Sequence, residues 1–472
     1  MADEALAHLT LSEAAAAIAS RKASSLEVTE ACLARIERHG DSLNAIAGID
    51  PEAALSAARA ADEELARAGP RGPLHGVPLA HKDMFYRAGR VSACGSRILQ
   101  DYVPGHTATV LSRLDAAGAL DIARLNMVEF AYGTTGHNEI TGAVRNPWNR
   151  EHITGGSSSG SGASVAARLV FGALGSDTGG SVRLPAAACG LIGIKPTYGR
   201  VSRYGAMPLS FSLDTIGPLV RSVADAALLL EVIAGQDDND PTSSHRAVPG
   251  YTAGLDQGVE GLRIGLPENY FYDPVEPEVA ALVRASLEVF EALGAELVPV
   301  ALPASVAASN ALSMMLISIE GASFHARWLR ERREDYGAQT LGRLLPGLLY
   351  PATRYIEALK LRGKLLDDLR ASVFDRVDVI HTPMWPFPLP TIAGSDVAAN
   401  PGFLEFLADT GHCARPVNFA GLPALVVPAG CTENGLPTAF QLIGRPFDEG
   451  LLLAAAAAYE RETGCTAQAP PL

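Results

Sequence analysis

The hydrophobic and polar positions of this chain follow two alternating patterns. Apolar residues recur at helical spacing over 52–68, 221–234 and 277–293, whereas short apolar runs over 119–125 and 377–381 are typical of buried strands. The two patterns succeed one another along the chain. This succession favours an α/β protein whose sheet is covered by helices on its faces.

Other segments extend this picture. Residues 4–39 indicate two helices, the second preceded by a capping box at Ser24–Glu27 and stopped at Gly40. Residues 303–370 have a mainly helical pattern, and we expect a variable cap over a pocket there. Further helices are predicted over 107–118 and 448–462, and further strands over 262–266, 296–300, 425–427 and 438–443.

Length and composition predict one large domain. The 472 residues could fill roughly three domains of about 150 residues. However, no linker divides the chain, and its Pro, Gly and Ser residues coincide with turns. We therefore expect a single domain over 1–472, with N-terminal helices over 1–70 and a core over 72–235.

Charge and cysteine usage exclude several classes of protein. The net charge of −14 argues against a nucleic-acid surface, which needs a basic stripe, and no Lys/Arg run suggests a site for an anionic membrane. Apolar runs are far shorter than the ~20 residues of a membrane span, and no signal peptide is visible. The scattered cysteines are typical of reduced thiols. We expect a cytoplasmic protein that binds neither nucleic acid nor membrane, and leave a homo-oligomer open.

One central segment is rich in glycine and serine. Its two clusters, Gly155–Gly162 and Ser176–Ser181, flank an apolar run. The pattern predicts a strand at Leu169–Phe171, a turn at Thr178–Gly180 and a helix that begins at Ser181. Such a turn directs backbone N–H groups at one point, so that a serine hydroxyl there would lie beside an oxyanion hole. A glycine-serine loop without chemistry is the alternative.

A lysine ends a predicted strand upstream of these clusters. Short apolar steps over Gly72–Phe85, punctuated by Gly and Pro, indicate a buried strand that ends at Lys82. Lys82 could form a salt bridge with Asp83. It could instead be desolvated, and neutral enough to act as a base. Lys195 also falls in apolar, glycine-rich surroundings.

Two loops carry aromatic side chains that could line a pocket. The first, Asn126–Gly136, contains Phe130 and Tyr132, and is equally compatible with a covered surface loop. The second follows the strand at 377–381 and contains Met384 and Trp385. These four side chains are our candidates for the wall of a substrate pocket.

Motifs for several kinds of chemistry are absent from the sequence. It contains no HExxH, zinc-spaced His/Cys cluster, GxxxxGK[ST] or GxGxxG. Gly156–Gly160 matches GxSxG with Ser158 as nucleophile, but residues 146–154 do not form the strand that this motif requires, and nothing singles out His381 or His412 as its partner. A serine without histidine needs another base. A buried lysine can serve, directly or through a second serine.

The motifs resemble those of the amidase signature family. Gly155–Ser161 is similar to its first motif and Gly175–Arg183 to its second, while Gly72–Pro78 before Lys82 resembles its lysine segment. The resemblance covers nearly the whole chain. It implies an α/β/α domain around a twisted mixed β-sheet, and hydrolysis of an amide C–N bond through a seryl acyl-enzyme, without metal or cofactor.

The resemblance also implies roles for individual residues. A Ser-Ser-Lys triad would consist of Ser181 as nucleophile, Ser157 (after a cis peptide bond) as proton relay and Lys82 as base. The oxyanion hole would be formed by the backbone N–H groups of Thr178, Gly179, Gly180 and Ser181. Three further side chains would hold the glycine-rich loops together: Ser158, Asp177 and Arg183.

Within the family, Lys195–Gly205 is especially similar to the glutaminase subunits of glutamyl-tRNA(Gln) amidotransferases. Two positions depart from that subgroup. Gly411, with Asp409 nearby, falls where the subgroup has an acidic residue that helps to hold glutamine, and Leu184 replaces a polar residue. Arg343 could match an arginine of the glutamine site, although its neighbours differ.

These departures, together with the aromatic pocket candidates, favour a stand-alone amidase that acts on a small apolar or aryl amide. The alternatives are the glutaminase subunit of the amidotransferase and a hydrolase of carbamate- or urea-type amides. In each case the partner implied is a small-molecule amide.

Overall fold

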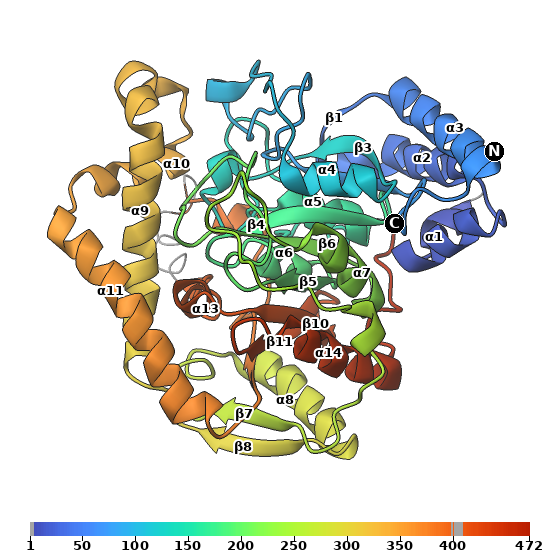
Figure 1. The fold of residues 1–472 in the computed structure, drawn as a ribbon. Helices are drawn as coiled ribbons and strands as arrows, with labels where there is room; N and C mark the ends of the chain where they lie inside the picture. The colour runs from blue at the N-terminus through green and yellow to red at the C-terminus, as the bar shows by residue number, and fades with distance from the viewer. Residues whose placement is uncertain (1–3, 398–399, 401–408) are drawn as a thin grey trace.

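The computed structural model describes residues 4–397, 400 and 409–472. In this part of the chain, eleven strands form one mixed sheet with helices on both faces (Figure 1). The predicted α/β class and the mixed sheet are therefore confirmed. In spatial order the strands are β1 (Ile46–Ile49), β3 (Leu120–Leu125), β2 (Pro78–Lys82), β4 (Gly172–Asp177), β6 (Thr215–Val220), β5 (Ile192–Lys195), β10 (Ala424–Cys431), β11 (Pro437–Gly444), β9 (Val379–Pro383), β7 (Arg263–Pro267) and β8 (Glu296–Val300).

Helices cover this sheet and extend beyond it. Helices α7, α8 and α14 pack on strands of the sheet, as do α5 and α6, while α9 and α11 stand at its side. The helices are α1 (Leu11–Ala19), α2 (Ser25–Leu43), α3 (Pro51–Ala68), α4 (Thr109–Ala116), α5 (Ser159–Ala166), α6 (Arg183–Ala188), α7 (Val223–Ile233), α8 (Pro277–Ala292), α9 (Ser305–Glu331), α10 (Ala338–Leu344), α11 (Ala352–Leu369), α13 (Arg415–Ala420) and α14 (Glu449–Thr463).

Helix α2 shows one prediction confirmed and one wrong. Its capping box is present, because the Ser24 hydroxyl accepts a hydrogen bond from the Glu27 N–H and the Glu27 carboxylate accepts one from the Ser24 N–H. The helix does not stop at Gly40. It continues to Leu43, and Asn44 ends it in the left-handed conformation (φ 51°). A buried interior glycine costs a helix only about 1 kcal/mol, and packing can offset that cost.

The glycine- and serine-rich segment differs from its predicted form. The strand expected at Leu169–Phe171 lies three residues later, in β4, and the first cluster forms the buried helix α5. The small residues of α5 allow it to pass close to neighbouring backbone. A Cβ atom on Gly160 would lie 2.4 Å from the Asn126 carbonyl oxygen and 2.6 Å from that of Ala45. Tertiary contact therefore overrides the low helix propensity of Gly and Ser.

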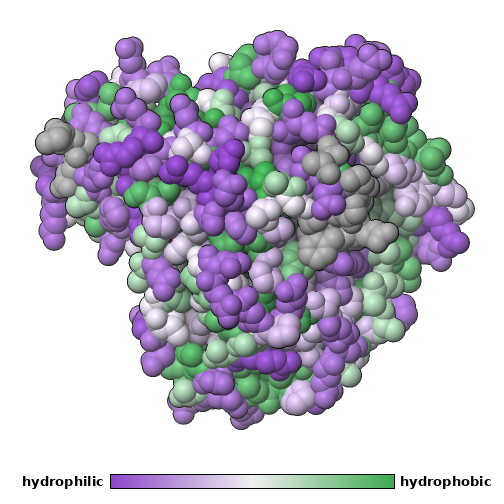
Figure 2. Space-filling model, turned by 180° about the vertical axis from the view of Figure 1, so that it is seen from behind, coloured by the Kyte–Doolittle hydropathy of each residue, from purple (hydrophilic) through white to green (hydrophobic). Residues whose placement is uncertain are grey.

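The surface is mixed in character. On the face opposite that of Figure 1, hydrophilic residues are interspersed with apolar ones (Figure 2). Among the described residues, no helix combines the length and the apolar character that crossing a bilayer requires.

A buried lysine closes β5. Lys195 is completely inaccessible to solvent, and its ammonium group donates a hydrogen bond to the Pro196 carbonyl oxygen at 2.9 Å. Burial, reinforced by the positive charge of Arg183, lowers the pKa of Lys195 to about 7.

The close passage of α5 can be tested by adding one methyl group. We expect Gly160→Ala to lower the free energy of unfolding by about 1–3 kcal/mol, because the methyl group must displace backbone carbonyl groups. Gly363→Ala in α11 is the control. Nothing lies within 4 Å of its Cβ position, so this change should stabilise the protein by about 0.5–1 kcal/mol. Urea denaturation measures both, and equal shifts would contradict the packing of α5.

The buried Lys195 predicts a pH dependence of stability. Between its folded pKa of about 7 and the ordinary value of 10.5, the unfolded lysine holds a proton that the folded one lacks. The free energy of unfolding should therefore rise with pH in this window, by up to about 1.4 kcal/mol per pH unit. We expect urea denaturation of Lys195→Met to show a slope shallower by that amount. The exposed Lys360→Met should retain the slope of the unmodified protein, and identical slopes in all three would refute the shift.

Candidate active site

Lys82 is buried between two serine hydroxyl groups. It ends β2 next to β4, with 1% of its surface exposed, and its ammonium group donates to Ser157 Oγ at 2.7 Å and to Ser176 Oγ at 2.8 Å. Burial lowers the pKa of Lys82 to about 7, against the opposing effect of the Asp214 and Asp177 carboxylates. Near neutral pH a substantial fraction of this lysine is therefore neutral.

The salt bridge with Asp83 that the sequence allowed does not form. The Asp83 carboxylate instead accepts a hydrogen bond from Arg124 Nη1 at 2.8 Å, and Lys82 points away towards the serines. Ser176, which no sequence motif assigned to the lysine, is the second group in contact with it.

The loop that precedes α5 presents Ser157 to the lysine. The peptide bond between Gly156 and Ser157 is cis, as the family resemblance implies. The next residue, Ser158, donates its N–H to the Ser181 carbonyl oxygen at 3.3 Å, and its hydroxyl contacts the Ser176 carbonyl oxygen at 3.4 Å. The two glycine- and serine-rich clusters, far apart on either side of α5, are thus side by side.

Ser181 lies on the turn between β4 and α6. It is 5% exposed and lines a cavity, and within the described residues its hydroxyl makes no hydrogen bond. The turn requires glycine at residue 180, where φ is +116° and a Cβ atom would lie 2.7 Å from that of Ala414. The Ser181 hydroxyl is therefore held at the cavity and available to a bound molecule.

The N–H groups of this turn are not equivalent. Gly180 donates its N–H to Asp177 Oδ1 at 2.8 Å, so that the Asp177 carboxylate occupies it. The N–H groups of Gly179 and Ser181 have no partner in the part of the chain that the structure describes. Thr178 contributes its hydroxyl to Asp214 at 2.5 Å. Of the four expected oxyanion donors, Gly179 and Ser181 have the freest N–H groups.

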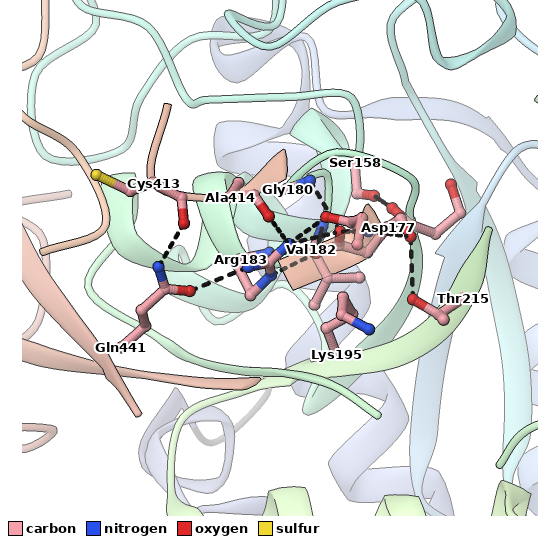
Figure 3. A network of polar contacts seen from close by, with 12 residues as sticks. Ser158, Asp177, Gly180, Val182, Arg183, Lys195, Thr215, Cys413, Ala414 and Gln441 are labelled. Atoms are coloured by element: carbon pink, nitrogen blue, oxygen red, sulfur yellow. Dashed lines mark hydrogen bonds and ion pairs between the residues drawn. The ribbon is translucent and has the colours of Figure 1, made fainter. Parts of the chain in front are cut away.

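Asp177 and Arg183 form a fully buried ion pair at the centre of this network (Figure 3). The Asp177 carboxylate accepts hydrogen bonds from the N–H of Val182 and from Asn418 Nδ2, besides Gly180. Burial alone would raise the pKa of Asp177, but the Arg183 guanidinium and these hydrogen bonds hold it well below its usual range. The carboxylate therefore stays ionised and fixes the turn that carries Ser181.

Arg183 connects this turn to the C-terminal part of the sheet. Its guanidinium donates to Gln441 Oε1 in β11 at 3.0 Å, to Asn418 Oδ1 in α13 at 2.6 Å and to the Ala414 carbonyl oxygen at 3.2 Å. Gln441 in turn donates to the Cys413 carbonyl oxygen at 2.7 Å (Figure 3). Lys195 lies near this network but contacts neither Ser157 nor Ser181.

The cavity over Ser181 combines apolar and cationic walls. Its volume is about 40 Å³, and α9 contributes Met314 and Ile317 to its lining. Two guanidinium groups also line it, those of Arg343 in α10 and Arg415 at the start of α13. The sequence connects Arg343 with a glutamine site but does not single out Arg415.

The four candidate pocket residues lie in different places. Tyr132 lines the cavity, whereas Phe130 packs against His325 and Trp328. Met384 and Trp385 are buried outside the cavity lining, and Trp385 Nε1 donates to the Leu184 carbonyl oxygen at 3.1 Å.

The histidines considered for a GxSxG mechanism lie away from Ser158. His381 contacts the hydroxyl groups of Tyr272 and Ser286, and His412 stacks on Tyr270. Among the described residues, no group of three or more His, Cys, Asp or Glu side chains is arranged to hold a metal ion.

Comparison with known proteins agrees with this geometry. The family model for "Amidase" matches residues 27–453. One relative belongs to the glutamyl-tRNA(Gln) amidotransferase of Methylococcus capsulatus, in which it is the subunit designated GatA. The chain is 41% identical to it over 487 residues, which cover 98% of both chains.

Solved structures share the whole fold. One, described as a vestigial protein complex that reveals the origins of an s-triazine catabolic enzyme, is 35% identical with a TM-score of 0.89, and covers 97% of this chain and 99% of that one. The corresponding amidotransferase subunit of Thermotoga maritima is 33% identical with a TM-score of 0.82, and covers 98% and 96%. With a family model, a full-length relative and full-length structures in agreement, this chain belongs to the amidase family, whose members are hydrolases of C–N bonds.

Proposed function

We propose that this chain hydrolyses a small amide that carries a carboxylate, through an acyl-enzyme on Ser181. The observation that carries the proposal is the pair of guanidinium groups, Arg343 and Arg415, in the wall of the cavity that contains the Ser181 hydroxyl. Guanidinium groups bind carboxylates with charge-assisted and often bidentate hydrogen bonds. Two of them beside the nucleophile favour an anionic substrate.

In the proposed reaction, Ser181 attacks the amide carbonyl carbon. Its proton passes to Ser157 as the Ser157 proton passes to neutral Lys82, along the hydrogen bond already present between them. The N–H groups of Gly179 and Ser181 stabilise the oxyanion. The C–N bond then breaks as the leaving nitrogen takes a proton back through Ser157. Water hydrolyses the ester by the same steps in reverse, which restores Ser181 and releases the acid.

An apolar or aryl amide, the substrate class expected from the sequence, is less favoured. That expectation depended on Met384 and Trp385, neither of which lines the cavity. An aryl group would also lie against two cations without neutralising either charge.

A second candidate is the glutaminase subunit of an amidotransferase. The 41% identity to the M. capsulatus relative over nearly the full length favours it, and glutamine carries a carboxylate. In that case this chain would act with partner subunits, and its glutaminase activity would rise when they and charged tRNA are added.

Ammonia release from a matched pair of amides tests the substrate class. Succinamate and butyramide differ mainly in a carboxylate that replaces a methyl group, and we expect kcat/KM to be at least about 10-fold higher for succinamate. Benzamide and glutamine complete the panel. Equal or better turnover of butyramide and benzamide would overturn the anionic substrate class.

The same assay tests the triad. Ser181→Ala and Lys82→Met should each lower kcat by about 10³-fold or more. Because Lys82 must be neutral to accept a proton, kcat/KM should rise with pH through about 7. Full activity in either variant, or a rate that falls as pH rises from 6 to 8, would refute the assigned roles.

A further inference from the structure

Gly411 leaves the space in which the Arg415 guanidinium lies. A Cβ atom on Gly411 would be 2.4 Å from Arg415 Cζ and 2.6 Å from both Nε and Nη2. Residue 411 has no positive φ angle, so the backbone does not itself demand glycine there. The glycine is required by the arginine, which occupies the volume that any other side chain at 411 would take.

Other contacts hold Arg415 in the cavity wall. Asn310 in α9 accepts a hydrogen bond from Arg415 Nη1 at 3.0 Å. The aliphatic part of Arg415 passes beside the turn of the nucleophile, since a Cβ atom on Gly179 would lie 3.4 Å from Arg415 Cγ. The guanidinium thus belongs to a built site next to the reacting atoms.

Arg343 adds a second positive charge to the same cavity. Over the described ranges, Arg343 makes no hydrogen bond and no ion pair, although burial and its neighbours lower its pKa only to about 10, so that it stays charged. The charge of Arg343 also lowers the pKa of Arg415, which burial already depresses to about 10. The two cations repel each other in the absence of an anion.

Carboxylates near this cavity face other partners. Among the described residues, no Asp or Glu lines it. Asp214 accepts hydrogen bonds from Thr178 and from backbone N–H groups, and Glu320 accepts them from Ser210 and Tyr355. Asp409 lies close enough to raise the pKa of Arg415, but is exposed and outside the lining.

We infer that Arg415, in the space left by Gly411, makes this enzyme select amides of dicarboxylic acids over amides of α-amino acids. The inference rests on the proposed function and specifies its substrate. A carboxylate gains two guanidinium partners, whereas an α-ammonium group would meet two like charges and no described carboxylate. Like-charge contact in a desolvated site is strongly unfavourable.

Glutaramate and glutamine form the matched pair, because they differ only in the α-ammonium group. We expect kcat/KM for glutaramate to exceed that for glutamine by about 100-fold or more. In Arg415→Met the ratio should fall by at least about 10-fold, through slower turnover of glutaramate and a relative gain for glutamine. The exposed Arg330→Met, in α9 outside the cavity lining, should leave the ratio unchanged.

Gly411→Ala provides a second variant that keeps the charge. Its methyl group displaces the guanidinium without removing it, so the ratio should again fall. Calorimetric binding of glutarate and glutamate gives a readout without catalysis, and glutarate should bind more tightly to the unmodified protein and lose that advantage in Gly411→Ala.

The outcomes separate the two proposals. Equal turnover of glutaramate and glutamine, or a ratio unchanged in both Arg415→Met and Gly411→Ala, would overturn the inference and leave the carboxylate-bearing substrate class intact. If glutaramate and succinamate are no better than butyramide, the proposed function itself fails.

Discussion

The buried ion pair between Asp177 and Arg183 is the interaction on which the rest of the site depends. Removing both charges from water is costly, and the cost is offset only because every face of the pair is hydrogen-bonded. Those hydrogen bonds come from the turn of Ser181, from α13 and from β11. A single electrostatic requirement therefore fixes the nucleophile's loop against the C-terminal strands and brings Asn418 and Ala414 under the cavity.

Burial and position contribute separately to the chemistry of the lysines. Lys82 and Lys195 both end central strands, and burial lowers the pKa of each to about 7. Only Lys82 has hydroxyl groups within hydrogen-bond distance, because β2 lies beside β4 and the loop of Ser157 crosses its end. Desolvation prepares a lysine to exchange protons, but the order of the strands decides which lysine has a serine to exchange them with.

Much of this fold is legible in the sequence, and the exceptions have physical causes. Strands and helices with clear periodicity, such as β9 and α8, occur within a few residues of their predicted positions. The position predicted for β4 is wrong because its residues, GALGSD, are too small to give an apolar pattern. Trp385 suggested a pocket wall, but a sequence does not show that its N–H meets a carbonyl group inside the core. Arg415 escapes notice in the sequence because its role depends on space at Gly411, which becomes visible only in three dimensions.

The triad and the two arginines come from different parts of the architecture. Lys82, Ser157 and Ser181 belong to the first half of the chain and to the central strands, whereas Arg343 and Arg415 come from helices that follow β8. A change of side chain in those helices can alter the charge that a substrate meets while leaving the proton path as it is. Such a division lets one reaction be inherited unchanged by enzymes that feed on different compounds, since new substrates require mutations only where the old substrate was recognised.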